Sequence, residues 1–334
     1  MRKILMIATG GTIASTSTSH GLAPNLLSAE ILKYVPSVYE ICDVETIQLF
    51  NIDSTNMTPA HWLQIAAAIE AHYDRYDGFV ILHGTDTMSY TAAALSYLIQ
   101  NGTKPIVLTG SQRPIEKEIT DAKRNLYESF LYASDQESKN VNIIFDGHII
   151  CGTRARKSRS HSFNAFSSIN FPDIAVIRNH KIIRYIKDNG AQSSPVFYHH
   201  LNDRVFLLKL IPGMKADIFD YIKNDYDAVI IESFGVGGLP KDAQDSFMQA
   251  VRRWINSDKI IVMSTQVPHE GSDMAVYDVG FQLKEQFELL EAYDMTMEAV
   301  VTKLMWILGQ TRDKDEIRRM FYTPVNYDTI NVYE

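Results

Sequence analysis

Two short motifs, each with threonine next to glycine, could supply hydroxyl groups for chemistry. The first is TGGTIAS, in which Gly11 and Thr12 follow the apolar segment Ile4–Ala8. Paired glycines let the backbone turn sharply and can leave amide N–H groups facing a ligand or an oxyanion. The motif lacks the lysine of a phosphate-binding loop and the GxGxxG pattern of a dinucleotide fold. On this motif alone, a plain turn with a capping threonine is the alternative interpretation.

The second motif is HGTDTM, in which His83 ends an apolar segment and Thr85 and Asp86 follow. Thr85 could act as a nucleophile or orient a water molecule, and Asp86 could hold a substrate ammonium group. The alternative for Asp86 is a helix cap, which is the usual role of such a residue. His83 could be a general base, although a histidine that ends an apolar strand is more often structural.

Two further polar segments could complete a site. The run NIDSTNM contains Asp53, Ser54 and Thr55, whose hydroxyls could hold a carboxylate or could belong to a simple polar loop. Lys157 lies in the basic run RARK and is a candidate partner for a threonine hydroxyl, which is a poor nucleophile without a base or a stabilising field. Burial lowers the pKa of a lysine and a carboxylate raises it, so the sequence leaves its charge open. The alternative is a surface lysine in a basic loop.

The elements that must position these motifs alternate between strand and helix. Continuous apolar runs are typical of strands covered on both faces, and they occur at Ile4–Ala8, Phe79–His83, Ile106–Thr109 and Val141–Phe145. Helical spacing predicts helices that begin at Thr58-Pro59, span Met88 to Ile99 before Asn101-Gly102, and run from Asp121 to about Ser134. This alternation predicts a mostly parallel sheet with helices on both faces. Ligands bind at the carboxyl ends of such strands, which is where the motifs lie.

The alternation loosens between Asp188 and Asp203 and then resumes. We therefore predict an N-terminal α/β domain over residues 1–187 that carries the catalytic residues, a linker over 188–204 and a C-terminal α/β domain over 205–334. The predicted elements of the second domain are Val205–Leu210, a helix from Ala216, Ala228–Ile231, a helix from Asp242, Ile260–Met263 and a helix around Met297–Leu308.

Composition narrows the class of protein. The chain has 334 residues, of which 46% are hydrophobic and 22% charged, as expected of a globular protein with a core. Its formal net charge of −8 disfavours a nucleic-acid-binding surface. Its apolar runs are much shorter than the roughly 20 residues of a membrane span, and the first is too short for a signal peptide. Two distant cysteines, Cys42 and Cys151, are typical of a reducing compartment. We expect a soluble cytoplasmic protein.

Taken together, the motifs resemble the bacterial-type L-asparaginase family in order, separation and letters. The resemblance rests on TGGTIAS at 9–15, HGTDTM at 83–88 and RARK at 154–157, with support from NIDSTNM, VLTGSQRP and GVGGLP along the chain. The TGSQRP run and the lack of a leader peptide are similar to the cytosolic type I branch.

This resemblance implies a larger N-terminal α/β domain with a mostly parallel sheet and a smaller C-terminal α/β domain. It implies conversion of L-asparagine and water to L-aspartate and ammonia, with Thr12 as nucleophile and with no cofactor or metal ion. It also implies a homodimer or homotetramer, with sites at the subunit interface. The implied catalytic residues are Thr12, Thr85, Asp86 and Lys157, and the implied substrate-binding residues are Gly11, Asp53, Ser54, Thr55, Thr85 and Asp86.

One position departs from the family pattern, because Leu22 stands where many relatives carry a tyrosine in the loop after the first motif. Residues Ser15–Pro24 are rich in Ser and Thr, which favours a mobile lid in which Leu22 shields Thr12 from water.

Other functions stay open. A glutaminase-asparaginase is one, because a pocket separates substrates that differ by a methylene by only about 1–3 kcal/mol. The amide-hydrolysing subunit of a tRNA-dependent amidotransferase is another, but such subunits carry an additional N-terminal domain and the first motif here begins at Thr9. A non-catalytic amino-acid sensor on the same scaffold is the third.

Overall fold

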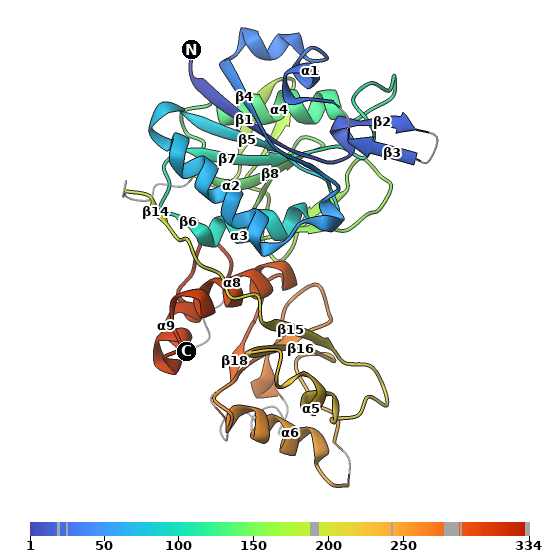
Figure 1. The fold of residues 1–334 in the computed structure, drawn as a ribbon, viewed down its shortest axis with the longest axis vertical. Helices are drawn as coiled ribbons and strands as arrows, with labels where there is room; N and C mark the ends of the chain where they lie inside the picture. The colour runs from blue at the N-terminus through green and yellow to red at the C-terminus, as the bar shows by residue number, and fades with distance from the viewer. Residues whose placement is uncertain are drawn as a thin grey trace. The chain divides into compact units, whose positions relative to one another are not determined.

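The computed structural model describes residues 1–18, 21–24, 26–187, 194–241, 243–276, 287 and 289–330. The chain forms two compact units (Figure 1). The first contains Met1–His199 and Val325–Tyr327, and the second contains His200–Pro324 and the described residues from Asp328 onward. Of the predicted linker, residues 188–193 lie outside the described residues.

The first unit is built on an eight-stranded sheet with the order β13-β12-β9-β8-β7-β5-β1-β4. The strands from β4 to β8 pair in parallel, whereas β9, β12 and β13 add antiparallel pairs at one edge. The mostly parallel sheet is thus confirmed. The strands are β1 Lys3–Gly10, β4 Asp43–Ile52, β5 Gly78–Leu82, β7 Pro105–Thr109, β8 Asn140–Phe145, β9 His148–Cys151, β12 Ala175–Arg178 and β13 Lys181–Arg184.

Helices cover both faces of this sheet, with α1 and α4 on one side and α2 and α3 on the other (Figure 1). Side chains alternate across a strand, so Ile4 and Met6 of β1 pack in the same buried cluster as Leu126 and Phe130 of α4. The helices are α1 Ser28–Leu32, α2 Pro59–His72, α3 Met88–Leu98 and α4 Ala122–Ala133. Short 3₁₀ turns at Thr12–Ala14, Pro36–Glu40, Ser54–Asn56 and Tyr73–Arg75 join some of these elements.

Most predicted boundaries agree with the structure to within a few residues. The α2 helix begins as predicted, because Thr58 and His61 form a capping box and Pro59 occupies the first turn. The α3 helix ends at Leu98 instead of continuing through Ile99, because β6 Ile99–Gln100 pairs with β14 Val196–Phe197.

The strand order of the first unit reverses at β1, whose neighbours are β4 and β5. The chain leaves β1 for β4 on one side, and it continues from β5 to β7 on the other. Such a switch point leaves a crevice outside the carboxyl ends of the strands, because the loops there run in opposite directions. The two threonine motifs follow β1 and β5, so both lie at the carboxyl ends of the strands at this switch point.

The segment predicted as a mobile lid contains two paired strands next to the first motif. Strands β2 Ser15–Thr18 and β3 Gly21–Pro24 pair antiparallel, with Ser17 opposite Leu22. The sequence pattern did not predict these two strands, because the segment is rich in Ser and Thr, although Thr is common in strands. The side chains of residues 16–25, Leu22 included, lie outside the described residues.

The second unit is a parallel four-stranded sheet with the order β15-β16-β17-β18. Its strands are β15 Val205–Lys209, β16 Ala228–Ser233, β17 Ile260–Thr265 and β18 Leu290–Glu291, and its helices are α5 Ile218–Ile222, α6 Ser246–Ile255, α8 Met297–Gln310 and α9 Lys314–Tyr322. Apolar side chains of α5 and α6 pack against one face. The helix predicted from Asp242, itself outside the described residues, begins at Ser246.

The smaller C-terminal α/β domain is therefore present as expected.

None of the helices in the described part of the chain is long and apolar enough to cross a membrane.

Candidate active site

Three loops that follow β1, β4 and β5 approach one another closely. A Cβ atom added at Gly11 would lie 2.4 Å from the Gly84 nitrogen, and one added at Gly84 would lie 2.6 Å from the Ser54 Oγ. Gly11 also has a φ of +85°, which disfavours any other residue. The glycines of the two threonine motifs are therefore needed for this close approach, and they bring both motifs together with Ser54.

The Gly11 amide serves the loop's own structure. Its N–H donates to the Ile52 carbonyl at 3.1 Å, and its carbonyl accepts from the Ser15 hydroxyl at 3.0 Å. Gly11 is thus used to fix the loop, and this N–H is not free to donate to an oxyanion.

Thr12 opens the 3₁₀ turn Thr12–Ala14 directly after Gly11. Its side chain is partly buried, and its hydroxyl forms no hydrogen bond with another residue that the structure describes. The hydroxyl is therefore not consumed by the fold, as a capping or turn-forming threonine would be.

Lys157 joins the two polar residues of the second motif. Its Nζ atom donates to the Thr85 Oγ1 at 2.7 Å and to the Asp86 Oδ1 at 2.6 Å. Thr85 is buried, the Lys157 side chain is 17% exposed and the Asp86 side chain is 57% exposed. The ammonium group is thus largely withdrawn from solvent and is held between a hydroxyl and a carboxylate.

Local structure explains how this contact forms. Lys157 ends β10 Ala155–Lys157, which pairs antiparallel with β11 Phe166–Ser168. The α3 helix begins at Met88 with Thr87 in the N-cap position. Asp86 therefore lies one residue before the cap and pairs with Lys157, which argues against the helix-cap interpretation.

Gln112 is a site residue that the sequence did not single out. It follows β7, the neighbour of β5, and its Oε1 accepts from the Thr85 hydroxyl at 3.2 Å. Its Nε2 donates to the Ser162 carbonyl at 3.2 Å. Because the Lys157 ammonium can only donate, the Thr85 proton is directed to Gln112. The only sequence signal was the polar run TGSQRP after an apolar strand.

His83 is fully buried and both ring nitrogens have partners. Its Nδ1 contacts the Gly84 carbonyl at 2.7 Å and its Nε2 contacts the Thr91 hydroxyl at 2.8 Å, while Trp62 Nε1 donates to Thr91 at 3.0 Å. A carbonyl only accepts, so Nδ1 carries the proton and Nε2 accepts from Thr91. Burial lowers the pKa of His83 to about 4. The imidazole is thus neutral and structural, and it fixes the carbonyl next to Thr85.

Asp53 and Thr55 mainly stabilise their own loop. The Asp53 Oδ1 caps the turn Ser54–Asn56, where it accepts from the Thr55 N–H and the Thr55 hydroxyl, each at 2.8 Å. Ser54 is buried and its carbonyl accepts from the Thr87 hydroxyl at 2.7 Å. Ser54 thus contacts the second motif at Thr87 and approaches Gly84.

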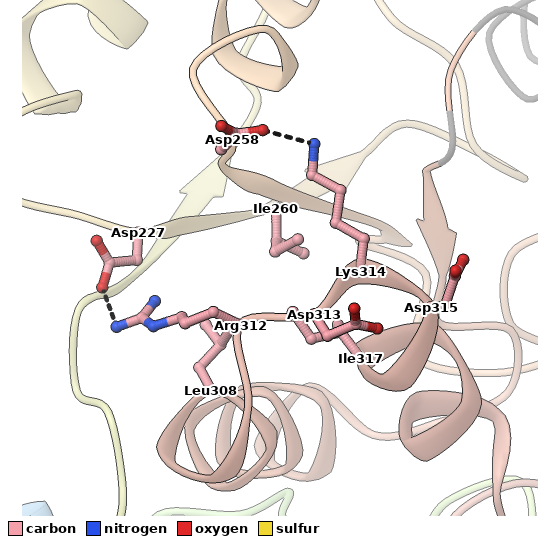
Figure 2. Close-up of a pocket in the computed structure, with 9 residues that line it drawn as sticks. All are labelled: Asp227, Asp258, Ile260, Leu308, Arg312, Asp313, Lys314, Asp315 and Ile317. Carbon is pink, nitrogen blue, oxygen red and sulfur yellow. Dashed lines mark hydrogen bonds and ion pairs between the residues drawn. The ribbon is translucent and has the colours of Figure 1, made fainter.

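A hollow in the second unit contains none of the predicted site residues (Figure 2). It is lined by Asp227, Asp258, Ile260, Leu308, Arg312, Asp313, Lys314, Asp315 and Ile317. Arg312 pairs with Asp227 at 2.9 Å and Lys314 pairs with Asp258 at 3.0 Å. These pairs hold the start of α9 beside the loops before β16 and β17. Across the described residues, no group of three His, Cys, Asp or Glu side chains is placed to hold a metal ion.

Two family models match the chain and together cover most of it. The model described as Asparaginase, N-terminal matches residues 3–189, and the Glutaminase/Asparaginase C-terminal domain matches residues 204–321. The L-asparaginase of Thermococcus kodakarensis is 37% identical over 95% of this chain and 96% of its own length. L-asparaginase 1 of Escherichia coli K12 is 32% identical over 95% of each chain. A glutamyl-tRNA(Gln) amidotransferase subunit of Metallosphaera sedula is 35% identical over 96% of this chain and 75% of its own length.

Solved structures agree. The thermostable L-asparaginase of Thermococcus kodakarensis matches with a TM-score of 0.93 at 36% identity, over 98% of this chain and 99% of that one. L-asparaginase I of Vibrio cholerae matches with a TM-score of 0.89 at 28% identity, over 99% of each chain. By fold and sequence this protein is an amidohydrolase. It belongs to the asparaginase family, as the resemblance of its motifs indicated, and its matches include type I enzymes.

Proposed function

We propose that this protein hydrolyses L-asparagine to L-aspartate and ammonia with Thr12 as the nucleophile. The observation that carries the proposal is the contact of Lys157 with Thr85 and Asp86, in loops that meet the Gly11–Thr12 segment. The names of the matched relatives support the same reaction.

Amide hydrolysis needs a nucleophile, a stabilised oxyanion and a proton for the leaving amine. The Thr12 oxygen attacks the side-chain carbonyl carbon of asparagine and loses its proton. The tetrahedral intermediate then expels ammonia, which carries that proton away, and an aspartyl ester remains on Thr12. Water cleaves the ester, which releases aspartate and restores the hydroxyl.

Lys157 and Thr85 provide the route for the proton. For this transfer Lys157 would be a neutral amine, which can accept a proton from Thr85 across the 2.7 Å contact, and the Thr85 hydroxyl would turn from Gln112 to Lys157. Thr85 would in turn take the Thr12 proton, because it lies in the loop that packs against the Thr12 loop. The buried, neutral His83 is left out of this route because both of its nitrogens already have partners.

Substrate recognition uses the same loops. Asp86 is largely exposed and carries the negative charge that would receive the α-ammonium group, beside its contact with Lys157. Ser54, with its neighbours Asp53 and Thr55, would receive the α-carboxylate. Gly11 lets these loops approach each other closely.

The protein would work in the cytoplasm as a homodimer or homotetramer. The boundary between its two domains would lie in residues 188–204. Sedimentation at assay concentration tests the assembly. A fully active monomer would contradict it.

A second candidate is a glutaminase-asparaginase of broader specificity, which the description of the matched C-terminal domain favours. Steady-state ammonia release from L-asparagine, D-asparagine and L-glutamine, measured side by side, tests both candidates. We expect the highest kcat/KM on L-asparagine. Equal values for L-glutamine would select the broader enzyme, and no release from any substrate would overturn the proposed function.

A further inference from the structure

A short segment near the C-terminus belongs to the first unit. It contacts the residues that come just before the strand that carries Lys157. Residues Val325–Tyr327 belong to the first unit, although the chain up to Pro324 and from Asp328 belongs to the second. Helix α9 ends at Tyr322, and Pro324 prevents it from continuing. The three residues that follow can therefore adopt a conformation of their own.

That conformation is unusual. Asn326 and Tyr327 both have positive φ values, of 47° and 59°. Asparagine visits this left-handed region fairly often, but tyrosine seldom does, so two in succession persist only where the surroundings hold them. The contacts of the two residues identify these surroundings.

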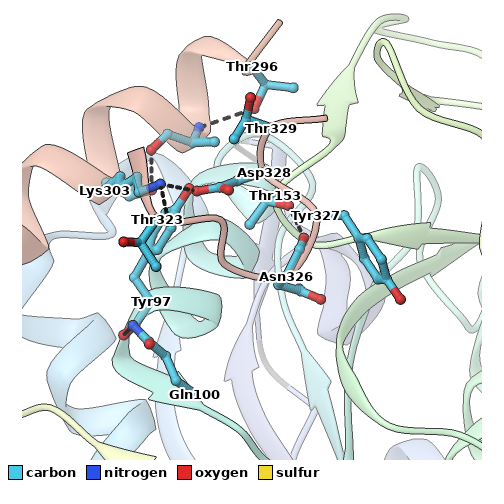
Figure 3. A network of polar contacts seen from close by, with 12 residues as sticks. Tyr97, Gln100, Thr153, Thr296, Lys303, Thr323, Asn326, Tyr327, Asp328 and Thr329 are labelled. Atoms are coloured by element: carbon cyan, nitrogen blue, oxygen red, sulfur yellow. Dashed lines mark hydrogen bonds and ion pairs between the residues drawn. The ribbon is translucent and has the colours of Figure 1, made fainter. Parts of the chain in front are cut away.

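Both backbone carbonyls accept hydrogen bonds from the turn that leads into β10. The Asn326 carbonyl accepts from the Thr153 hydroxyl at 2.6 Å (Figure 3). It also accepts from the Cys151 thiol at 2.9 Å. The Tyr327 carbonyl accepts from Arg154 Nε at 2.5 Å. Cys151, Thr153 and Arg154 are fully buried, so the tail meets groups that water does not reach.

Side chains fix the tail in the same place. The Asn326 amide donates to the Ser96 hydroxyl at 3.0 Å and to the Val141 carbonyl at 3.1 Å, which uses both of its protons. The Tyr327 ring stacks on the Phe171 ring, with 5.1 Å between the centroids. The Arg154 guanidinium lies 5.4 Å from the centroid of the Phe171 ring.

The anchored turn determines where β10 begins. Arg154 immediately precedes Ala155, the first residue of β10, and its carbonyl accepts from the Ile169 N–H at 2.9 Å. Lys157 is the last residue of this three-residue strand. A shift of Arg154 would therefore displace the ammonium group of Lys157. A misplacement of about 1 Å at a reacting group can cost roughly 10²-fold in rate.

We propose that Asn326 and Tyr327 are positioning residues for Lys157, which they hold in place through Thr153 and Arg154. The inference rests on the proposed role of Lys157 in amide hydrolysis. It assigns a function in the reaction to a tail that is about 170 residues from Lys157 in sequence. The tail reaches the first unit through hydrogen bonds between residues that are 173 and 175 positions apart.

Two variants test the inference in the full-length protein. Asn326→Gly keeps the left-handed backbone accessible but removes the amide anchor, and Thr153→Val removes the hydroxyl donor while it keeps the branched shape. We expect each to lower kcat for L-asparagine by about tenfold with a smaller change in KM, because the Ser54 loop is unchanged and Asp86 is affected only through its contact with Lys157. Thr153→Ser restores the donor and should recover most of the turnover.

A Lys157→Met background separates positioning from general loosening. If the tail acts through Lys157, Asn326→Gly should cause no further loss of kcat there, because the two effects are coupled. A loss of equal size in both backgrounds would overturn the inference.

Thr329→Val is the matched control, because it removes a buried hydrogen bond of the same tail, from Thr329 to Asp294 at 2.8 Å, in the second unit. It should lower Tm but leave kcat unchanged. Full kcat in folded Asn326→Gly and Thr153→Val would overturn the inference alone. A wild-type protein that releases no ammonia from L-asparagine would overturn the proposed function and this inference with it.

Discussion

Lys157→Met removes the ammonium that contacts Thr85 while it keeps a long, unbranched side chain. The change should affect the folding free energy and the catalytic barrier by different amounts. The ion pair with Asp86 joins a carboxylate whose side chain is 57% exposed, so its loss should cost less than about 1 kcal/mol of folding free energy. Loss of a positioned proton-transfer group typically costs at least ~10²-fold in rate, which corresponds to about 2.7 kcal/mol in the barrier.

We therefore expect a folded variant with kcat for L-asparagine at least ~10²-fold below wild type and a melting temperature within a few degrees of it. Ammonia release at saturating substrate measures the first quantity, and calorimetry measures the second. Lys314→Met is a matched control, because Lys314 forms an exposed ion pair with Asp258 at 3.0 Å in the second unit. It should leave kcat unchanged. Wild-type turnover and an unchanged pH profile in Lys157→Met would refute the reasoning and return Lys157 to a surface role.

Further outcomes can be stated briefly. Thr12→Val and Thr85→Val should each reduce kcat by at least ~10²-fold with the fold intact, and near-normal turnover in either removes that threonine from the mechanism. Gly84→Ala should destabilise the protein by more than about 1 kcal/mol in denaturant titration, because its Cβ would lie 2.6 Å from the Ser54 Oγ. Leu22→Ala should raise KM and lower kcat together by a moderate factor, and a change in neither contradicts the shielding role.

His83 predicts a pH dependence of stability. Its folded pKa of about 4 lies below the unfolded value of 6.5, so the unfolded chain binds more protons between these values. Stability should therefore fall as pH drops from 6.5 towards 4, by on the order of 3 kcal/mol from this group. In His83→Gln the fall over this window should be smaller when unfolding is followed at several pH values. An equally steep fall would assign the effect to other groups.

Sequence patterns predicted the central strands because those strands are covered on both faces. Ile4–Ala8 and Ile106–Leu108 are apolar throughout, and both lie in buried strands next to helices. The edge strand β13 Lys181–Arg184 was missed, because its alternate side chains are exposed and it is short. A strand of four mixed residues has little periodicity of its own, and its pairing depends on β12.

The candidate site shows the same limit. Thr12, Thr85 and Asp86 were singled out because each follows an apolar strand, where parallel sheets place ligands. Gln112 was missed, because its contact with Thr85 depends on β5 lying beside β7, which no local pattern indicates. The contact of Lys157 with Thr85 is set by β10, a polar strand whose position depends on pairing with β11.

The hydrogen bonds that start at Trp62 also give the protein an optical reporter. The indole is largely buried, and it is linked by three successive hydrogen bonds through Thr91 and His83 to the Gly84 carbonyl, next to Thr85. Indole emission responds to the polarity and hydrogen bonding around the ring, so a shift of this loop would change the fluorescence of Trp62. With Trp254 and Trp306 replaced, substrate binding could be followed by light emission, without a coupled enzyme or an attached dye.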